Sequence, residues 1–159
     1  MKKYNPTQLP FTKNEKESLI KHKIKIGNLF DYAPDEWELL LNITSERARE
    51  LQALAEFQTI PSIGIQFAKD LVFMGFYSIN ELKEKNPALL TDAYEQKKGY
   101  WMDPCVEDQF RLAVYVANTH DDTKKWWNFT SERKQYRLEN GYPKNRPSLS
   151  WYESNKRKS

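Results

Sequence analysis

A proline, a serine and a glycine interrupt the apolar pattern of TIPSIGIQFAKDL, residues 59–71. The spacing places Gly64 where a turn leads into a new helix, and the first N–H groups of a helix have no acceptor within it. These donors and the positive end of the helix dipole favour an anion such as phosphate. Because glycine has no Cβ, a phosphate can approach this backbone closely. The stretch therefore predicts either an anion site made of main-chain amides or a tight corner between two packed helices.

The residues assigned to this anion site follow from the predicted turn. Ile60 and Ile63 would anchor the turn in the core, while Gly64 would leave the next two N–H groups pointing outward. Lys69, one helical turn further on, is the nearest cation. The phosphate-binding or DNA-binding set is Ser62, Gly64, Ile65, Gln66 and Lys69.

Two further stretches have residue types that suit nucleic acid. In KKWWNF, Lys124 and Lys125 stand beside Trp126 and Trp127, a combination that can hold phosphate and stack bases of a single strand. The competing interpretation, which we favour, is that at least one tryptophan anchors the core. The stretch RKQYRLENG predicts a helix with a basic face. This face would either make auxiliary contacts with nucleic acid or simply be exposed to solvent. Its cations are Arg133, Lys134 and Arg137.

The sequence does not favour catalysis. Cys105 and His120 could act as nucleophile and base only if the thiol pKa were lowered and the imidazole were within reach, and their spacing secures neither. One cysteine and two histidines do not form an ordinary structural zinc site. With five glycines in the chain, no glycine-rich ATP loop is present. We expect no enzymatic activity, metal or cofactor, and no small-molecule substrate.

Length and composition favour one globular domain, because 159 residues with 39% hydrophobic residues can build a core. The single cysteine excludes an intramolecular disulfide, and no stretch is apolar enough for a signal peptide or a membrane span, so a cytoplasmic location is expected. The net charge of +3 is unevenly distributed: residues 1–30 carry +5, residues 31–121 carry −8 and residues 122–159 carry +6. Nucleic-acid binding by the acidic middle would therefore need help from the basic ends.

Helical patterns dominate, and most have recognisable boundaries. Thr12 and Glu15 form a capping-box pattern, and Asn86–Pro87 and Asp103–Pro104 each read as a helix start. Gly75 and Gly141 read as helix ends. No run alternates with a period of two, so the predicted fold class is all-α, a compact multi-helix domain. We expect a flexible N-terminal segment at 1–11, a single helical domain at 12–141 and a basic C-terminal tail at 142–159.

Two short patterns occur twice. Ile-x-x-Leu-x-x-x-x-Pro runs from Ile26 to Pro34 and again from Ile79 to Pro87. A pattern of Ile, four residues, Ala, a cation, an acid and Leu begins at Ile43 and again at Ile63. These matches suggest that one helical hairpin design is used more than once.

The segment IPSIGIQFAKDL resembles a helix-hairpin-helix motif, placed at about residues 45–75. The resemblance implies a SAM-like fold, with one hairpin or a tandem pair, and sequence-independent binding of the DNA backbone. Ser62 replaces the first glycine of the usual motif, and Gln66 replaces a frequent cation. Residues 20–130, including DPCVEDQFRLAVYVAN and KKWWNF, also resemble the bacterial pathogenicity-locus family, whose biochemical role is poorly defined.

Two functions therefore stay open. The first is non-catalytic, sequence-independent binding of DNA through the turn at Gly64. The alternative is a protein-interaction or adaptor module in which the hairpin is purely structural. In either case the partner is a nucleic acid or an unidentified protein, and no membrane is expected.

Overall fold

The structure is a computed structural model that describes residues 8–158. Helices account for all of its regular elements in this range, which confirms the all-α class. The one bridge between extended residues within the described range joins Trp101 and Ser150 in parallel. None of the described helices is both long enough and apolar enough to cross a membrane.

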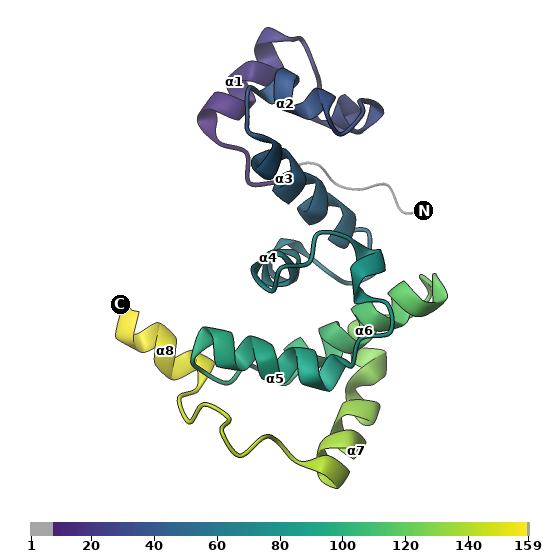
Figure 1. Ribbon diagram of the computed structural model, residues 1–159, viewed down its shortest axis with the longest axis vertical. Helices are drawn as coiled ribbons and strands as arrows, with labels where there is room; N and C mark the ends of the chain where they lie inside the picture. The colour runs from purple at the N-terminus through teal and green to yellow at the C-terminus, as the bar shows by residue number, and fades with distance from the viewer. Residues whose placement is uncertain (1–7, 159) are drawn as a thin grey trace. The chain divides into compact units, whose positions relative to one another are not determined.

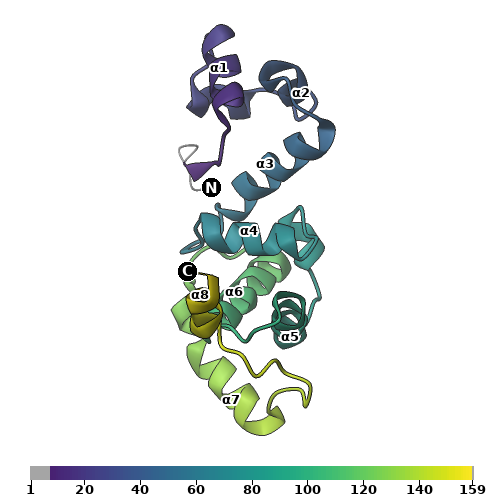
Figure 2. The ribbon, with the colours of Figure 1, turned by 90° about the vertical axis from the view of Figure 1, so that its left-hand side faces the viewer.

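The chain divides into two compact units, at residues 1–78 and 79–159. In the first unit, the turn at residues 58–64 redirects the chain between its last two helices (Figures 1 and 2). Its core includes Leu19, Leu29, Trp37, Leu51 and Phe57, all at most 2% exposed. The elements of the first unit are α1 (Lys13–Lys21), η2 (Ile26–Asp31), α2 (Glu36–Leu41), α3 (Ser45–Phe57) and α4 (Ile65–Phe73).

The second unit is built around its longest helix, and its core includes Leu82, Tyr94, Phe110 and Leu112. Tyr94 and Phe110 meet edge to face with ring centroids 5.8 Å apart. This contact joins the first two α-helices of the unit. Its elements are η3 (Ile79–Leu82), α5 (Pro87–Lys98), α6 (Cys105–Thr119), η4 (Trp126–Phe129), α7 (Thr130–Asn140) and α8 (Trp151–Lys158).

Most helix boundaries lie where the sequence places them. The Thr12 hydroxyl accepts from the Glu15 N–H while the Glu15 carboxylate accepts from the Thr12 N–H, which is a complete capping box. Asn86 caps α5, and Asp103 Oδ1 accepts from the Cys105 N–H at the start of α6. Gly75 follows α4 in the left-handed region at φ 89°, where glycine is unstrained.

The repeated sequence patterns have matching local structures. Leu29 and Leu82, the leucines of the first pattern, both lie in 3-10 helices and are fully buried. Leu51 and Leu71, the leucines of the second pattern, are fully buried on α3 and α4. Each repeat therefore places the same residue type at an equivalent core position.

The C-terminal segment contains a helix that the sequence patterns did not reveal. Ser150 and Glu153 form reciprocal hydrogen bonds at the start of α8, and Ser150 is 1% exposed. At the first residue of α8, the Trp151 N–H donates to the Trp101 carbonyl at 2.8 Å. Before this helix, Arg146 pairs with the buried Glu95 at 2.8 Å. Residues 146–154, which lie in the expected basic tail, therefore pack against the rest of the second unit.

The N-terminal segment expected at residues 1–11 is described only in part, because residues 1–7 lie outside the described residues. Within the described part, Leu9 and Phe11 are buried. The Pro10 carbonyl accepts from Arg47 Nη2 at 2.8 Å. Residues 9–11 are therefore held against α3.

Candidate functional site

The turn between α3 and α4 is fixed by apolar residues. Ile60, Pro61 and Ile63 are all buried. The Ile60 N–H donates to the Phe57 carbonyl at 3.1 Å, and the Ile63 N–H donates to the Ile60 carbonyl at 3.2 Å. The two isoleucines therefore hold the turn from the core side, as the sequence pattern predicts.

Ser62 adopts the left-handed backbone conformation, with φ 62°. This region disfavours side chains with a Cβ and is where glycine is usually found. The Ser62 hydroxyl donates to the Pro61 carbonyl at 2.5 Å, and the residue is half-buried. The serine thus holds a backbone conformation in which glycine is more common.

Gly64 begins α4 as its N-cap residue, with φ −105° and ψ −171°. It contributes no side-chain cap, and the space where a Cβ would stand has no heavy atom within 4 Å among the described residues. Gly64 and Gln66 are exposed, while Ile65 is half-buried. The start of α4 is therefore open, with main-chain donors that no capping side chain occupies.

Lys69 is exposed on α4, four residues after Ile65 and three after Gln66. Residues at these spacings lie on the same side of a helix. The structure thus brings all five residues of the predicted anion site into one turn and the helical surface that follows it. The cation lies beside the turn rather than in it.

The corresponding turn between α2 and α3 has the same backbone form but a different end. Asn42 is left-handed at φ 54°, Ile43 follows it, and Thr44 is the N-cap of α3. The Thr44 hydroxyl accepts from the Arg47 N–H at 3.1 Å. A side chain therefore accepts a hydrogen bond from one of the first main-chain N–H groups of α3, whereas no side chain caps the start of α4.

Two of the predicted auxiliary cations form internal ion pairs. Arg133 Nε lies 2.6 Å from Asp108 Oδ1, and the Arg133 side chain is 12% exposed. Arg137 is 9% exposed and lies 2.8 Å from Asp92 and 2.6 Å from Glu107. The partner carboxylates neutralise both charges, so these two arginines are structural in this unit.

The remaining auxiliary residues are wholly or partly exposed. Lys134 is exposed on α7, and Lys124 is exposed with its Nζ 4.5 Å from the centroid of the Tyr115 ring. Lys125 is half-buried at the start of η4. Trp126 is half-buried and Trp127 is 54% exposed, so the two tryptophans divide between packing and surface.

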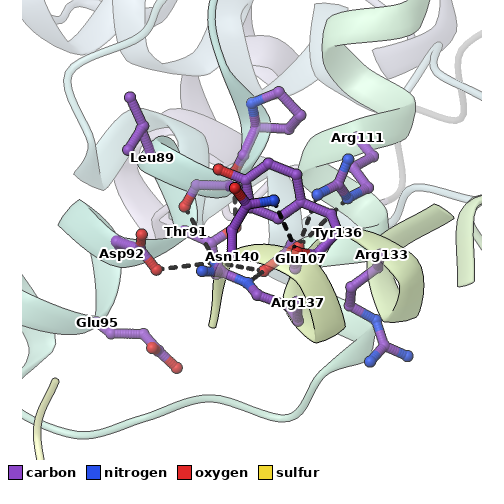
Figure 3. A network of polar contacts seen from close by, with 12 residues as sticks. Leu89, Thr91, Asp92, Glu95, Glu107, Arg111, Arg133, Tyr136, Arg137 and Asn140 are labelled. Carbon is purple, nitrogen blue, oxygen red and sulfur yellow. Dashed lines mark hydrogen bonds and ion pairs between the residues drawn. The ribbon is translucent and has the colours of Figure 1, made fainter. Parts of the chain in front are cut away.

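A buried polar network connects α5, α6 and α7 (Figure 3). Glu107, 2% exposed, accepts from Arg111 Nη2 at 3.0 Å through one oxygen and from Arg137 Nε at 2.7 Å through the other. Burial disfavours the charge of Arg137, but the hydrogen bonds to Glu107 and Asp92 outweigh this and raise its pKa. The network was not predicted, although the spacing of Glu107 and Arg111, four residues apart on a helix, is a recognisable signal.

Cys105 and His120 do not form a catalytic pair. They lie at opposite ends of α6, which at 1.5 Å per residue separates them by roughly 20 Å. Burial, together with a hydrogen bond to Asp103, raises the pKa of the Cys105 thiol to about 12. The neutral thiol is therefore the stable form, and the thiolate required of a nucleophile is disfavoured.

Comparison with known proteins identifies the family. Residues 50–135 match the sequence model of the pathogenicity-locus family. The chain is also similar to the mitomycin resistance protein McrB of Streptomyces lavendulae, at 27% identity over 81 residues, which are 51% of this chain and 76% of the relative. No solved structure matches significantly. The family match includes the open turn at Gly64 and extends through Arg133, and it covers more than half of the sequence. The chain belongs to the pathogenicity-locus family.

Proposed function

We propose that this protein binds the backbone of nucleic acids, independently of base sequence and without catalysis, through the turn between α3 and α4. One observation carries the proposal: a left-handed residue, Ser62, leads into an exposed and uncapped helix start at Gly64. Main-chain N–H groups at such a position attract an anionic oxygen through their partial positive charge. A phosphate of the DNA backbone supplies that oxygen.

The resemblance to a helix-hairpin-helix motif supports the same function. The usual motif has glycine where Ser62 stands, and the φ of 62° at Ser62 is compatible with the backbone form that a glycine would adopt. The companion turn at Thr44 lacks an open N-cap, so it is assigned a structural role. The proposed contact is therefore limited to Ser62, Gly64, Ile65 and Gln66, with Lys69 beside them.

Main-chain amides alone would give weak binding that depends little on salt. Each phosphate that a lysine or arginine neutralises adds about 0.9 to the slope of log affinity against log salt concentration. Lys69 lies beside the turn, and the exposed Lys124 and Lys134 belong to the second unit. Arg133 and Arg137 are omitted from the proposed interface because internal carboxylates neutralise them.

A fluorescence-polarisation titration tests the proposal. The full chain is titrated against labelled double-stranded and single-stranded DNA of several unrelated sequences, at about 50 and 200 mM salt. We expect measurable binding at low salt with similar affinity for duplexes of different sequence, because the turn contacts only the backbone. The absence of binding at low salt would eliminate the function.

Protein docking is the alternative, and the apolar residues on the surface of the first unit favour it. Ile20 is 75% exposed and Leu39 is 81% exposed, each on a helix that contacts the other. Exposed aliphatic side chains are typical of docking surfaces when they form a continuous patch. If this alternative holds, Ile20→Ser with Leu39→Ser will remove capture of a protein partner while leaving DNA titrations unchanged.

A further inference from the structure

The second unit contains a cavity of about 470 Å³ that the DNA-binding turn does not use. Its walls come from residues 84–86, from the start of α5, and from α6, η4 and α7. They include the aromatic rings of Tyr115, Phe129 and Tyr136. Aromatic walls of this kind suit a planar ring system, because every nucleobase has a π-face that can stack on them.

Arg111 supplies a buried cation to this cavity. It is 7% exposed and lines the cavity, and its guanidinium carbon lies 5.1 Å from the centroid of the Tyr136 ring. Figure 3 shows this guanidinium beside the Tyr136 side chain, with contacts running to Glu107. A buried arginine requires acceptors for its N–H groups, so each unsatisfied donor needs an explanation.

The contacts of Arg111 leave one edge of its guanidinium unused. Nε and Nη2 donate to the same Glu107 oxygen, at 3.3 and 3.0 Å. Nη1 has no hydrogen-bond acceptor among the residues that the structure describes, and neither does the second hydrogen of Nη2. Together these hydrogens form the end-on fork of the guanidinium, which binds two acceptor atoms side by side.

The charges around the cavity select among the ligands that this fork can bind. The lining holds two cations, Arg111 and the exposed Lys85, and two exposed carboxylates, Glu84 and Glu132. A carboxylate or phosphate would fit the fork but offers no hydrogen-bond donor to the two glutamates. Guanine instead offers two acceptors, O6 and N7, to an arginine fork, and its N1–H and N2–H₂ donors suit a carboxylate. Adenine offers a donor where guanine has O6, so it would oppose the fork.

We propose that this cavity binds a guanine base, with Arg111 donating to O6 and N7, Glu132 accepting from the N1–H and N2–H₂ edge, and Tyr136 stacking on the ring. The site goes beyond the phosphate-binding turn and does not depend on it. Guanine could be presented by a free nucleotide or by an unpaired base of a single strand, and the base chemistry is the same in both.

Isothermal titration calorimetry with guanosine and adenosine monophosphates tests the site. The two probes carry the same phosphate, so a difference between them reports the base alone. We expect the guanine nucleotide to bind at least about tenfold more tightly, in line with the discrimination of a bidentate arginine contact. Equal affinities, or no binding of the guanine nucleotide, would overturn the proposal.

Glu132→Gln is the variant that identifies the pocket, because Glu132 is exposed and its loss leaves the buried network intact. The variant should lower the affinity for the guanine nucleotide about tenfold and leave the affinity for the adenine nucleotide unchanged. Glu17→Gln, which removes an exposed carboxylate of α1, is the matched control and should alter neither affinity. An unchanged ratio in Glu132→Gln would contradict the assignment.

The source of the base is distinguished with two nine-nucleotide single strands, one of thymidines and one with a central guanine. Because the strands differ in one base, contacts of the turn with their backbones cancel. Tighter binding of the guanine strand would assign the site to unpaired bases. If the two strands bind equally while the guanine nucleotide still binds, the site is assigned to free nucleotides. Gly64→Asp should leave the nucleotide affinities unchanged, which separates this site from the turn.

Discussion

Ser62 holds a backbone conformation that its side chain disfavours, at φ 62°. A left-handed residue with a Cβ costs roughly 1–2 kcal/mol, and β-branched residues are affected most. Ser62→Gly should therefore keep or raise the free energy of unfolding, by up to about 1 kcal/mol, while Ser62→Val should lower it by about 2 kcal/mol. Urea denaturation followed by circular dichroism measures both changes. A Val variant as stable as the natural chain would show that the turn is not held in this conformation.

The thiol of Cys105 provides a second test at the level of a single residue. Its pKa is raised to about 12, mainly by burial and then by its hydrogen bond to Asp103. Because alkylating reagents attack the thiolate, iodoacetamide at pH 8 should modify the folded chain at least about 100-fold more slowly than the chain unfolded in urea. Mass spectrometry measures the rate of modification in each state. Equal rates in the folded and the unfolded chain would contradict the inert environment assigned to this cysteine.

At the scale of the elements, local patterns predicted helix boundaries well. Thr12 with Glu15, Asn86 with Pro87 and Gly75 each act over a few residues, and the structure has each of them at a helix end. Ser150 with Glu153 is the same type of signal and marks the start of α8. It did not lead to a predicted helix, because the segment around it has little apolar periodicity. Ser78 with Glu81 has the matching pattern, yet only the four-residue η3 follows.

The candidate sites differ in how far local sequence can reveal them. The turn at Gly64 is contiguous, so its residues could be assigned from spacing alone. The network around Glu107 joins residues 30 positions apart, and nothing near Arg137 indicates that Glu107 and Asp92 will neutralise it. Arg137 was therefore assigned to the surface from a helical pattern, whereas α7 turns it inward.

The polar network makes a prediction for the packing of α7. Arg137→Leu leaves Asp92 and one oxygen of Glu107 without their cation, and removing one partner of a buried pair costs about 3–5 kcal/mol. Urea denaturation should show a loss of this size. Lys134→Leu, at an exposed position of the same helix, should change stability by less than about 0.5 kcal/mol. Similar losses in both variants would mean that the network does not stabilise this unit.

The ion pair of Glu15 on α1 with Arg47 on α3, whose Oε1 and Nε lie 2.7 Å apart, should make the first unit sensitive to acid. Burial opposes ionisation of Glu15, but hydrogen bonds from Arg47 and Thr12 outweigh it, so its pKa lies below the ordinary 4.5. A carboxyl group with a lowered pKa stabilises the fold above its ordinary pKa, and this contribution is lost as the pH falls through the lowered value.

Glu15→Gln tests this sign. Between pH 7 and pH 3 the unfolding free energy of the natural chain should fall more steeply than that of Glu15→Gln, because glutamine has no charge to lose. Glu17→Gln, exposed on the same helix, should follow the natural chain. Denaturant titrations at each pH provide the comparison, and parallel curves for all three proteins would refute the role of the pair.

At the scale of the whole molecule, charge constrains how nucleic acid can bind. The net charge is only +3, and several cations that the sequence offers are already paired with carboxylates. With Lys69 as the cation nearest the turn, the dependence of log affinity on log salt should have a slope of about −1 to −2. A slope near −6 in the polarisation titrations would show that basic segments, rather than the turn, provide the contact.

The central claim is that the open start of α4 receives a phosphate, and a pair of matched substitutions tests it. Gly64→Asp places a carboxylate where the N-cap is now open, and its Cβ meets no heavy atom of the described residues within 4 Å. The new carboxylate would accept from the helix donors and repel phosphate, while an acidic N-cap preserves the helix. Thr44→Asp adds the same charge at the companion turn, which already has a side-chain cap.

The decisive measurement is the binding of double-stranded DNA by these two variants and the natural chain, by fluorescence polarisation at low salt, with circular dichroism to verify the fold. We predict that Gly64→Asp abolishes binding and that Thr44→Asp binds as the natural chain does. Undiminished binding by a folded Gly64→Asp variant would contradict the account.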